Sequence, residues 1–290
     1  GFIWNFSPRA MLFYDFNDNS SIRLFYFGNS SQPSSSQLNP VLDNSNPLSL
    51  SLGNPYLNPY FNHRLRSDIE FSNKQTFFTA RVHLEGGMVQ SPITNASWYD
   101  QNGRAYSFPV NGNNTYSSGM RVMINAPIAR SNFSISNMTN LSYSMTGSYI
   151  GEAKLNMSKY LELDPEGNVT AFKYSDFHED YYQDGKFIAG DDKDFKANTT
   201  HALSVTERLR ATYRSDNWEI IASGRTRMSK PWYTLQTATQ VDATWNNQVS
   251  ASVKWTIGNT GIEIGTDANY NWYNGYTTPQ DPELVWSATF

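Results

Sequence analysis

"FNHRLRSDIEFSNKQTFFTARVHLE", residues 61–85, is the stretch of sequence that decides the fold. From Phe61 to Phe71 every second residue is mostly apolar, and the residues between them are Asn, Arg, Asp or Glu. After the short segment SNKQ the apolar members are Phe78, Ala80, Val82 and Leu84, and the polar members are Thr79, Arg81, His83 and Glu85. Alternation with a period of two puts each set on one face of a β-strand. The stretch therefore predicts two long strands, joined by a tight turn, with one apolar and one polar face.

The same alternation recurs along most of the chain, and no segment shows a helical period of comparable strength. The predicted strands cover residues 10–16, 21–30, 61–71, 76–86, 114–126, 131–149, 200–214, 217–230, 244–257, 261–276 and 284–290. Several of them exceed the ~5–6 residues typical of strands in soluble proteins. The pattern indicates an all-β fold of antiparallel strands.

The connections between these strands alternate strictly between short and long. The short ones are 17–20, 72–75, 127–130, 215–217 and 258–261, and the long ones are 31–60, 87–113, 150–199, 231–243 and 277–283. Short turns then lie at one end of the sheet and long loops at the other. This is the layout of an outer-membrane β-barrel, with short periplasmic turns and long extracellular loops. The sequence predicts part of an antiparallel up-and-down transmembrane barrel in the bacterial outer membrane.

Alternation alone leaves two other classes of protein open. In a soluble, secreted β-sandwich or propeller, the polar face would meet solvent, and exposed Tyr and Trp side chains could bind carbohydrate. A porin without a plug would share the barrel but conduct passively. Strand length and the sorting of the loops favour the barrel over the soluble fold.

Composition excludes several functions. The formal net charge of −4 gives no basic surface for nucleic acid, and the absence of Cys removes thiolate nucleophiles and Cys-based zinc sites. No apolar run approaches the ~18 residues of a membrane helix. The four histidines lack metal-ligand spacing, and no nucleophile–base or phosphate-binding motif is present. We expect no enzyme, catalytic residue, metal or cofactor.

Residues 31–65, "SQPSSSQLNPVLDNSNPLSLSLGNPYLNPYFNHRL", carry a resemblance to a known family. The segment resembles the signature loop of the outer-membrane β-barrels of TonB-dependent receptors of Bacteroidota. The matching positions are Pro33, Leu38, Pro40, Asp43, Asn44, Asn46, Pro47, Leu48, Gly53, Asn54, Pro55, Leu57 and Pro59. A second segment, 253–276, resembles the family's near-terminal hairpin, although its turn reads GNTG where the family often has P-K-G.

The resemblance implies a barrel of about twenty-two strands, closed by an N-terminal plug, that imports a bound ligand with energy from TonB. Residues 1–290 would be a single barrel segment without the plug. The start at "GFIWNF", without Met or signal peptide, predicts a mature chain or a fragment of a longer protein. The implied partners are membrane lipid, the plug, TonB, and a small-molecule, glycan or peptide ligand that the sequence does not identify.

Two groups of residues are candidates for ligand binding. Arg208, Arg210, Arg225 and Arg227 share the polar side of two neighbouring predicted strands. They could line a lumen that attracts an anionic ligand or holds a plug, but we favour the alternative that luminal carboxylates pair with them. Asp191 and Asp192 belong to the acidic loop 176–194, which could hold a hard cation. Here we favour an ordinary solvated surface loop.

Glu207 does not fit the barrel pattern. It falls on the apolar side of its predicted strand, where a charge in the middle of the bilayer is costly. We therefore expect it to lie outside the bilayer or at a bulge.

Overall fold

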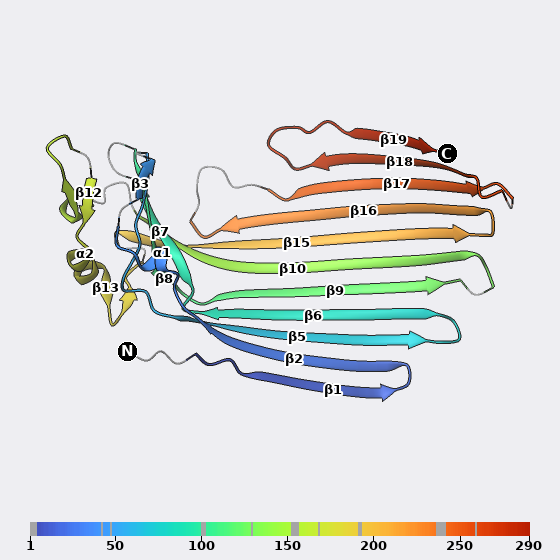
Figure 1. The fold of residues 1–290 in the computed structure, drawn as a ribbon, viewed down its shortest axis with the longest axis horizontal. Coiled ribbons are helices and arrows are strands. Elements are labelled where there is room, and N and C mark those ends of the chain that lie inside the picture. Colours follow the sequence, from blue (N-terminus) through green and yellow to red (C-terminus); the bar gives the residue numbers. More distant parts are fainter. Residues whose placement is uncertain are drawn as a thin grey trace.

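The computed structural model describes residues 5–41, 43–46, 48–99, 103–128, 130–151, 157–167, 169–190, 193–235, 242–258 and 260–290. Eleven long antiparallel strands form one continuous sheet and follow each other in chain order across it (Figure 1). They are β1 (Arg9–Asn17), β2 (Ser20–Ser31), β5 (Tyr60–Asn73), β6 (Phe78–Gln90), β9 (Thr115–Pro127), β10 (Phe133–Gly151), β15 (Phe195–Arg214), β16 (Trp218–Tyr233), β17 (Thr244–Thr256), β18 (Glu263–Asn274) and β19 (Glu283–Thr289). The predicted strands are confirmed. The largest shift is at β15, which begins at Phe195 where residue 200 was predicted.

All the short turns lie at one end of this sheet and the long connections at the other, as the sequence predicts (Figure 1). Asparagine side chains close two of the turns. Asn17 Oδ1 accepts the backbone N–H of Asn19 at 2.8 Å, and Asn73 Oδ1 accepts those of Gln75 at 2.9 Å and Thr76 at 3.1 Å. Such local bonds replace the hydrogen bonds between the two strands at the point where the chain reverses its direction. The long strands therefore run between a compact turn end and an elaborate loop end.

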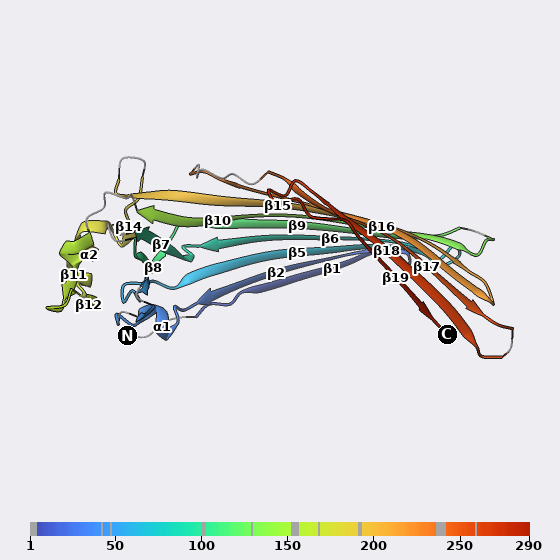
Figure 2. The ribbon, with the colours of Figure 1, turned by 90° about the horizontal axis from the view of Figure 1, so that it is seen from above.

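The strand register keeps an apolar and a polar face apart across the whole sheet. On the apolar face Ile22 pairs with Ile69, Ile69 with Val82, and Val82 with Val122. On the other face Arg23 pairs with Asp68, Asp68 with His83, and His83 with Arg121. The apolar side chains project outward and are well exposed, as at Leu209 (53 %) and Val249 (51 %). The sheet is strongly twisted (Figure 2), as long antiparallel sheets are.

Aromatic side chains border the apolar face near both ends. Near the loop end Tyr143 shares a 2.7 Å hydrogen bond with His201, whose ring stacks on Trp232 with 5.1 Å between ring centroids. Near the turn end Trp218 stacks on Trp255 at 5.5 Å. Amphipathic rings favour the headgroup region on either side of a bilayer. The band between the two rows is therefore the part of the sheet suited to hydrocarbon.

Three long connections, 32–59, 91–114 and 152–194, fold together at the loop end; their described residues are called the cap below (Figure 1). The cap contains α1 (Ser35–Leu38), β3 (Asp43–Asn46), β4 (Ser49–Ser51), β7 (Ile93–Tyr99), β8 (Ala105–Asn111), the 3₁₀ helix η1 (Met157–Tyr160), β11 (Leu161–Leu163), β12 (Val169–Phe172), α2 (Tyr174–Tyr181), β13 (Tyr182–Gln183) and β14 (Lys186–Phe187). The described residues of loop 31–60 form α1, β3 and β4, and the secondary structure of the cap was not predicted.

The buried hydrophobic core of the described residues lies in the cap and at the adjoining strand ends. Trp98, Phe108 and Phe195 are almost completely buried, and the Trp98 ring stacks on Tyr106 at 5.0 Å. The hairpin of β7 and β8 is anchored to the barrel sheet because Ala96 pairs in parallel with Tyr149 at the end of β10. The cap is therefore a small folded layer with its own core, joined directly to the sheet.

Glu207 lies in the middle of β15, and the expectation that it sits outside the band or at a bulge is wrong. Its cross-strand partners are Thr139 and Thr226, and the register on both sides is unbroken. Its strand continues by six residues to His201 in one aromatic row and by six to Tyr213 near the other. The side chain is consequently on the apolar face at mid-height.

Candidate functional site: the polar face and the cap

The polar face of the sheet is hollowed. One hollow of about 400 Å³ is lined by residues of β2, β5 and β6, among them Arg23 and Glu70. A second of about 680 Å³ and a third of about 300 Å³ continue across β9 and β10, and the third reaches Arg227 on β16. In an outer-membrane barrel the polar residues of each strand line the lumen. This face is therefore where a luminal ligand or domain would make contact.

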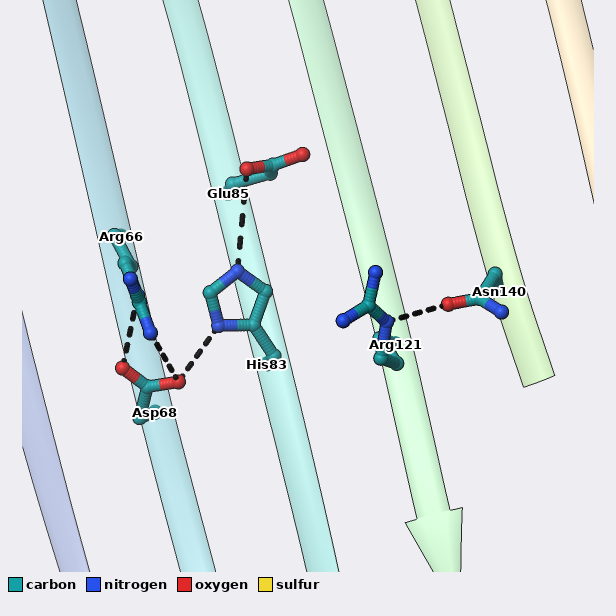
Figure 3. A network of polar contacts seen from close by, with 6 residues as sticks. All are labelled: Arg66, Asp68, His83, Glu85, Arg121 and Asn140. Carbon is teal, nitrogen blue, oxygen red and sulfur yellow. Dashed lines mark hydrogen bonds and ion pairs between the residues drawn. The ribbon is translucent and has the colours of Figure 1, made fainter. Parts of the chain in front are cut away.

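On β5 and β6 several luminal charged side chains are paired (Figure 3). Arg66 Nε donates to Asp68 Oδ2 at 3.0 Å, and His83 Nδ1 lies 2.6 Å from Asp68 Oδ1. The other nitrogen of His83 is 3.9 Å from the Glu85 carboxylate. On the next strands Arg121 Nε donates to Asn140 Oδ1 at 2.7 Å (Figure 3). This network combines ion pairs with hydrogen bonds to a neutral amide. It was not predicted, although charged residues recur at every second position in 62–85.

The four predicted arginines lie together on the same face, at β15 and β16. Arg208 and Arg225 are direct cross-strand partners, and Arg227 pairs with Thr206 one position further along. Arg210 pairs with Ser223. Among the described residues, none of these four guanidinium groups forms a hydrogen bond or an ion pair. The expectation that luminal carboxylates pair with them is therefore not met, because their cross-strand neighbours are neutral or also basic.

This arginine patch, defined as Arg208, Arg210, Arg225 and Arg227, leaves a positive potential on one side of the hollow face. Like charges directly opposite on neighbouring strands are destabilising, so the sheet itself gains nothing from the Arg208–Arg225 pair. A low-dielectric wall strengthens the field of such a patch and attracts anions. The patch is thus suited to a carboxylate or phosphate group, or to an acidic protein surface.

Asn54 of the predicted signature loop joins all three connections of the cap. It is 2 % exposed, and its Nδ2 donates to the Pro109 carbonyl oxygen of β8 and to the Tyr182 hydroxyl of β13, each at 2.8 Å. Its Oδ1 accepts the backbone N–H of Tyr56 at 3.0 Å. A side chain with both a donor and an acceptor is needed to satisfy these groups. The signature position is therefore a structural link between loops far apart in sequence.

The rest of the signature shapes the backbone around Asn54. A Cβ on Gly53 would overlap the Asn39 carbonyl oxygen, so glycine is required at this close approach. Ser34 and Gln37 form a capping box on α1, with the Ser34 N–H donating to Gln37 Oε1 at 2.9 Å. The S-x-x-Q spacing is a signal that sequence analysis missed. Asn44 and Asp43 lie in β3, Leu38 ends α1, and Pro33, Pro40, Pro55 and Pro59 lie in connecting segments, whereas Pro47 is outside the described residues.

The acidic loop is more ordered than the solvated loop we expected. Phe177 and Phe187 contribute to the cap core, while Asp180 and Asp194 accept hydrogen bonds from Tyr160 and Tyr181 respectively. The bond from Lys159 holds the pKa of Asp180 below its usual range. Asp191 and Asp192 lie outside the described residues, and the described part of the chain contains no group of three acidic or His side chains placed to hold a metal ion.

Several cap tyrosines have raised pKa values, and this predicts an alkaline limit for the cap. Burial raises the pKa of Tyr182 to about 12, and burial also raises the pKa values of Tyr174 and Tyr181. Since an unfolded Tyr titrates near pH ~10, this contribution to stability is complete below pH ~10 and is lost as the pH rises through about 12. External protease should therefore begin to cleave the cap of the embedded protein between these pH values. Exposed Tyr99→Phe should leave the midpoint unchanged, and cleavage already at pH ~9 would contradict the prediction.

None of the helices in the described residues is long and apolar enough to cross a membrane. The long strands, the sorted connections, the outward apolar band and the polar lumen define the chain as part of an outer-membrane β-barrel. The soluble sandwich or propeller is therefore the wrong alternative. The sequence profile of the outer membrane protein beta-barrel family matches residues 3–256, and the chain belongs to that family. A comparison with curated proteins finds no match.

Proposed function

We propose that the chain is the barrel portion of a TonB-dependent receptor that captures a ligand outside the cell and imports it. The observation that carries this proposal is the arginine patch, because its charges face the lumen without an acidic partner in the described residues. A plug with an acidic surface would neutralise the patch by charge-assisted hydrogen bonds. The role is transport without catalysis.

The shape of the sheet supports a larger barrel. The outer strands β1 and β19 each pair on one side alone, with β2 and β18. Unsatisfied backbone groups in hydrocarbon cost several kcal/mol each, on the order of what a hydrogen bond is worth there, so membrane sheets close into barrels. In the proposal, further strands pair with these two edges, as the resemblance to receptors of about twenty-two strands implies.

The cap supports the assignment of ligand capture to the loop end. Its three connections share one core, and surface loops held on a rigid scaffold commonly carry binding residues. Its exposed aromatic side chains include Tyr56 and Tyr99. In the proposal, the cap meets the ligand first and the luminal face next.

The rival within the same class of protein is a porin without a plug. To separate the two, we would reconstitute the full-length protein into dye-loaded liposomes and measure leakage. We would also test its binding to the purified periplasmic domain of TonB. The receptor proposal expects a sealed barrel that binds TonB. Steady leakage without TonB binding would establish the porin and overturn the proposal.

A further inference from the structure

A row of polar side chains crosses the apolar face at mid-height. It comprises Asn137 and Thr139 on β10, Glu207 on β15, Thr226 on β16 and Asn247 on β17, and is called the polar row below. Thr139 Oγ1 donates to Glu207 Oε2 at 2.6 Å, and Asn137 Nδ2 donates to the other carboxylate oxygen. Thr226 Oγ1 donates to Asn247 Oδ1 at 2.6 Å. The row thus consists of two hydrogen-bonded groups that lie side by side, because Glu207 and Thr226 are direct cross-strand partners.

Lipid cannot complete the hydrogen bonding of this row. Glu207 lies six residues from His201 and six from Tyr213, which is about 20 Å along the strand in each direction. That places it deep within the apolar band, away from headgroups and water. A carboxylate offers about four acceptor positions, and the described side chains fill two of them. Ionisable groups at such depth ordinarily face protein.

The surface beside the polar row is built partly of small residues. Ala211, Ala222, Ala251 and Ala268 are successive cross-strand partners on the same face. Between this alanine row and the polar row, Gly224 stands between Leu209 and Val249. Small side chains let the backbones of two membrane segments approach closely. The alanine row, Gly224 and the polar row occupy neighbouring positions on the same face of β15, β16 and β17.

We propose that this surface binds a second copy of the chain within the plane of the membrane. The polar row contains both donors and acceptors. Asn247 Nδ2 has a second hydrogen besides the one that it donates to Asn274 Oδ1. Glu207 and Thr226 have unused acceptor positions. A two-fold axis brings the same patch of both copies together, so a donor in the row of one copy can bond to an acceptor in the row of the other. The row is therefore complementary to the same row of a second copy. A lipid or an apolar helix is not complementary to it, because neither offers these hydrogen-bonding groups.

Cross-linking tests this proposal, and the 290 residues contain no native Cys to interfere. Val205→Cys places a thiol on the same face two residues from Glu207, and Ile22→Cys places one on the same face of distant β2. In membranes carrying the full-length protein, a bifunctional maleimide should join two copies through position 205. Position 22 should give at most a tenth of that product.

The hydrogen bonds of Glu207 are tested in the Val205→Cys background. Glu207→Leu should lower the cross-linked fraction at least fivefold, whereas Glu207→Gln, whose amide oxygen still accepts hydrogen bonds, should retain at least half of it. Heat-dependent electrophoretic migration checks that each variant is folded. Equal cross-linking at positions 22 and 205, no dimer at 205, or a product with a different polypeptide would each overturn the proposal. The comparison of positions 22 and 205 stands even if Glu207→Leu fails to fold.

Discussion

Replacing Asn54 with leucine is expected to open the cap while the barrel sheet stays folded. The change removes the bonds to Pro109, Tyr182 and Tyr56, and it leaves the buried Pro109 carbonyl oxygen and the part-buried Tyr182 hydroxyl without this partner. Each unsatisfied buried group costs about 1–3 kcal/mol, so the cap should lose about 3–5 kcal/mol. Leucine has a similar size, so packing alone does not explain a loss of this magnitude.

Protease added outside intact cells measures this opening, because the cap lies at the loop end of the sheet. When opening is faster than cleavage, the rate follows the open population, and a loss of ~3 kcal/mol corresponds to about 100-fold faster cleavage. Asn58→Ala is the matched control, since Asn58 is an exposed residue of the same loop. Equal cleavage of Asn54→Leu and the control would show that Asn54 does not hold the three connections together.

Under the receptor proposal, neutralising Arg208 and Arg225 together is expected to unseal the lumen without weakening the sheet. Their guanidinium groups have no partner among the described residues and lie directly opposite each other, so Arg208→Gln/Arg225→Gln should leave stability unchanged or raise it by about 0.5 kcal/mol. Bonds to an acidic plug are worth about 1.5–3 kcal/mol each. Their loss should raise dye leakage from liposomes that carry the full-length protein at least tenfold.

The control for this experiment removes two arginines that are already neutralised. Arg66 and Arg81 lie on the same face and pair with Asp68 and Glu70. Both ion pairs are half-exposed, so Arg66→Gln/Arg81→Gln should cost about 1 kcal/mol and leave leakage unchanged. A sealed lumen together with a destabilised sheet in the Arg208/Arg225 variant would mean that the patch is structural, contrary to the proposal.

The barrel sheet was predictable because the sequence features that specify its strands lie within each strand and its adjoining turn. Alternation in residues 61–85 defines two strands, and the lengths of the connections define which strand ends lie together. Hydrogen bonding between consecutive strands then follows from the short turns. For the same reason, the alternation of polar and apolar residues along β15 and β16 was enough to place their four arginines on the polar face.

The cap and the contacts of charged side chains could not be predicted in the same way. Asn54 and Tyr182 are 128 positions apart in the chain, and no period or spacing links them. Whether Arg208 has a hydrogen-bond or ion-pair partner depends on the side chains of the neighbouring strands. The alternation of polar and apolar residues within one strand does not reveal those neighbours. Glu207 departs from the pattern in the sequence, but its polar neighbours, such as Thr226, come from other strands. In each case the decisive contact joins distant residues.

One face of the sheet meets lipid and the other lines the lumen. We would place single cysteines at residues 79–85 of β6 in the full-length protein, attach an environment-sensitive fluorophore, and quench it with nitroxide-labelled lipid. The account predicts strong quenching at Ala80, Val82 and Leu84, and weak quenching at the residues between them. Uniform quenching along the strand, or quenching strongest at Arg81, His83 and Glu85, would contradict the assignment of the two faces.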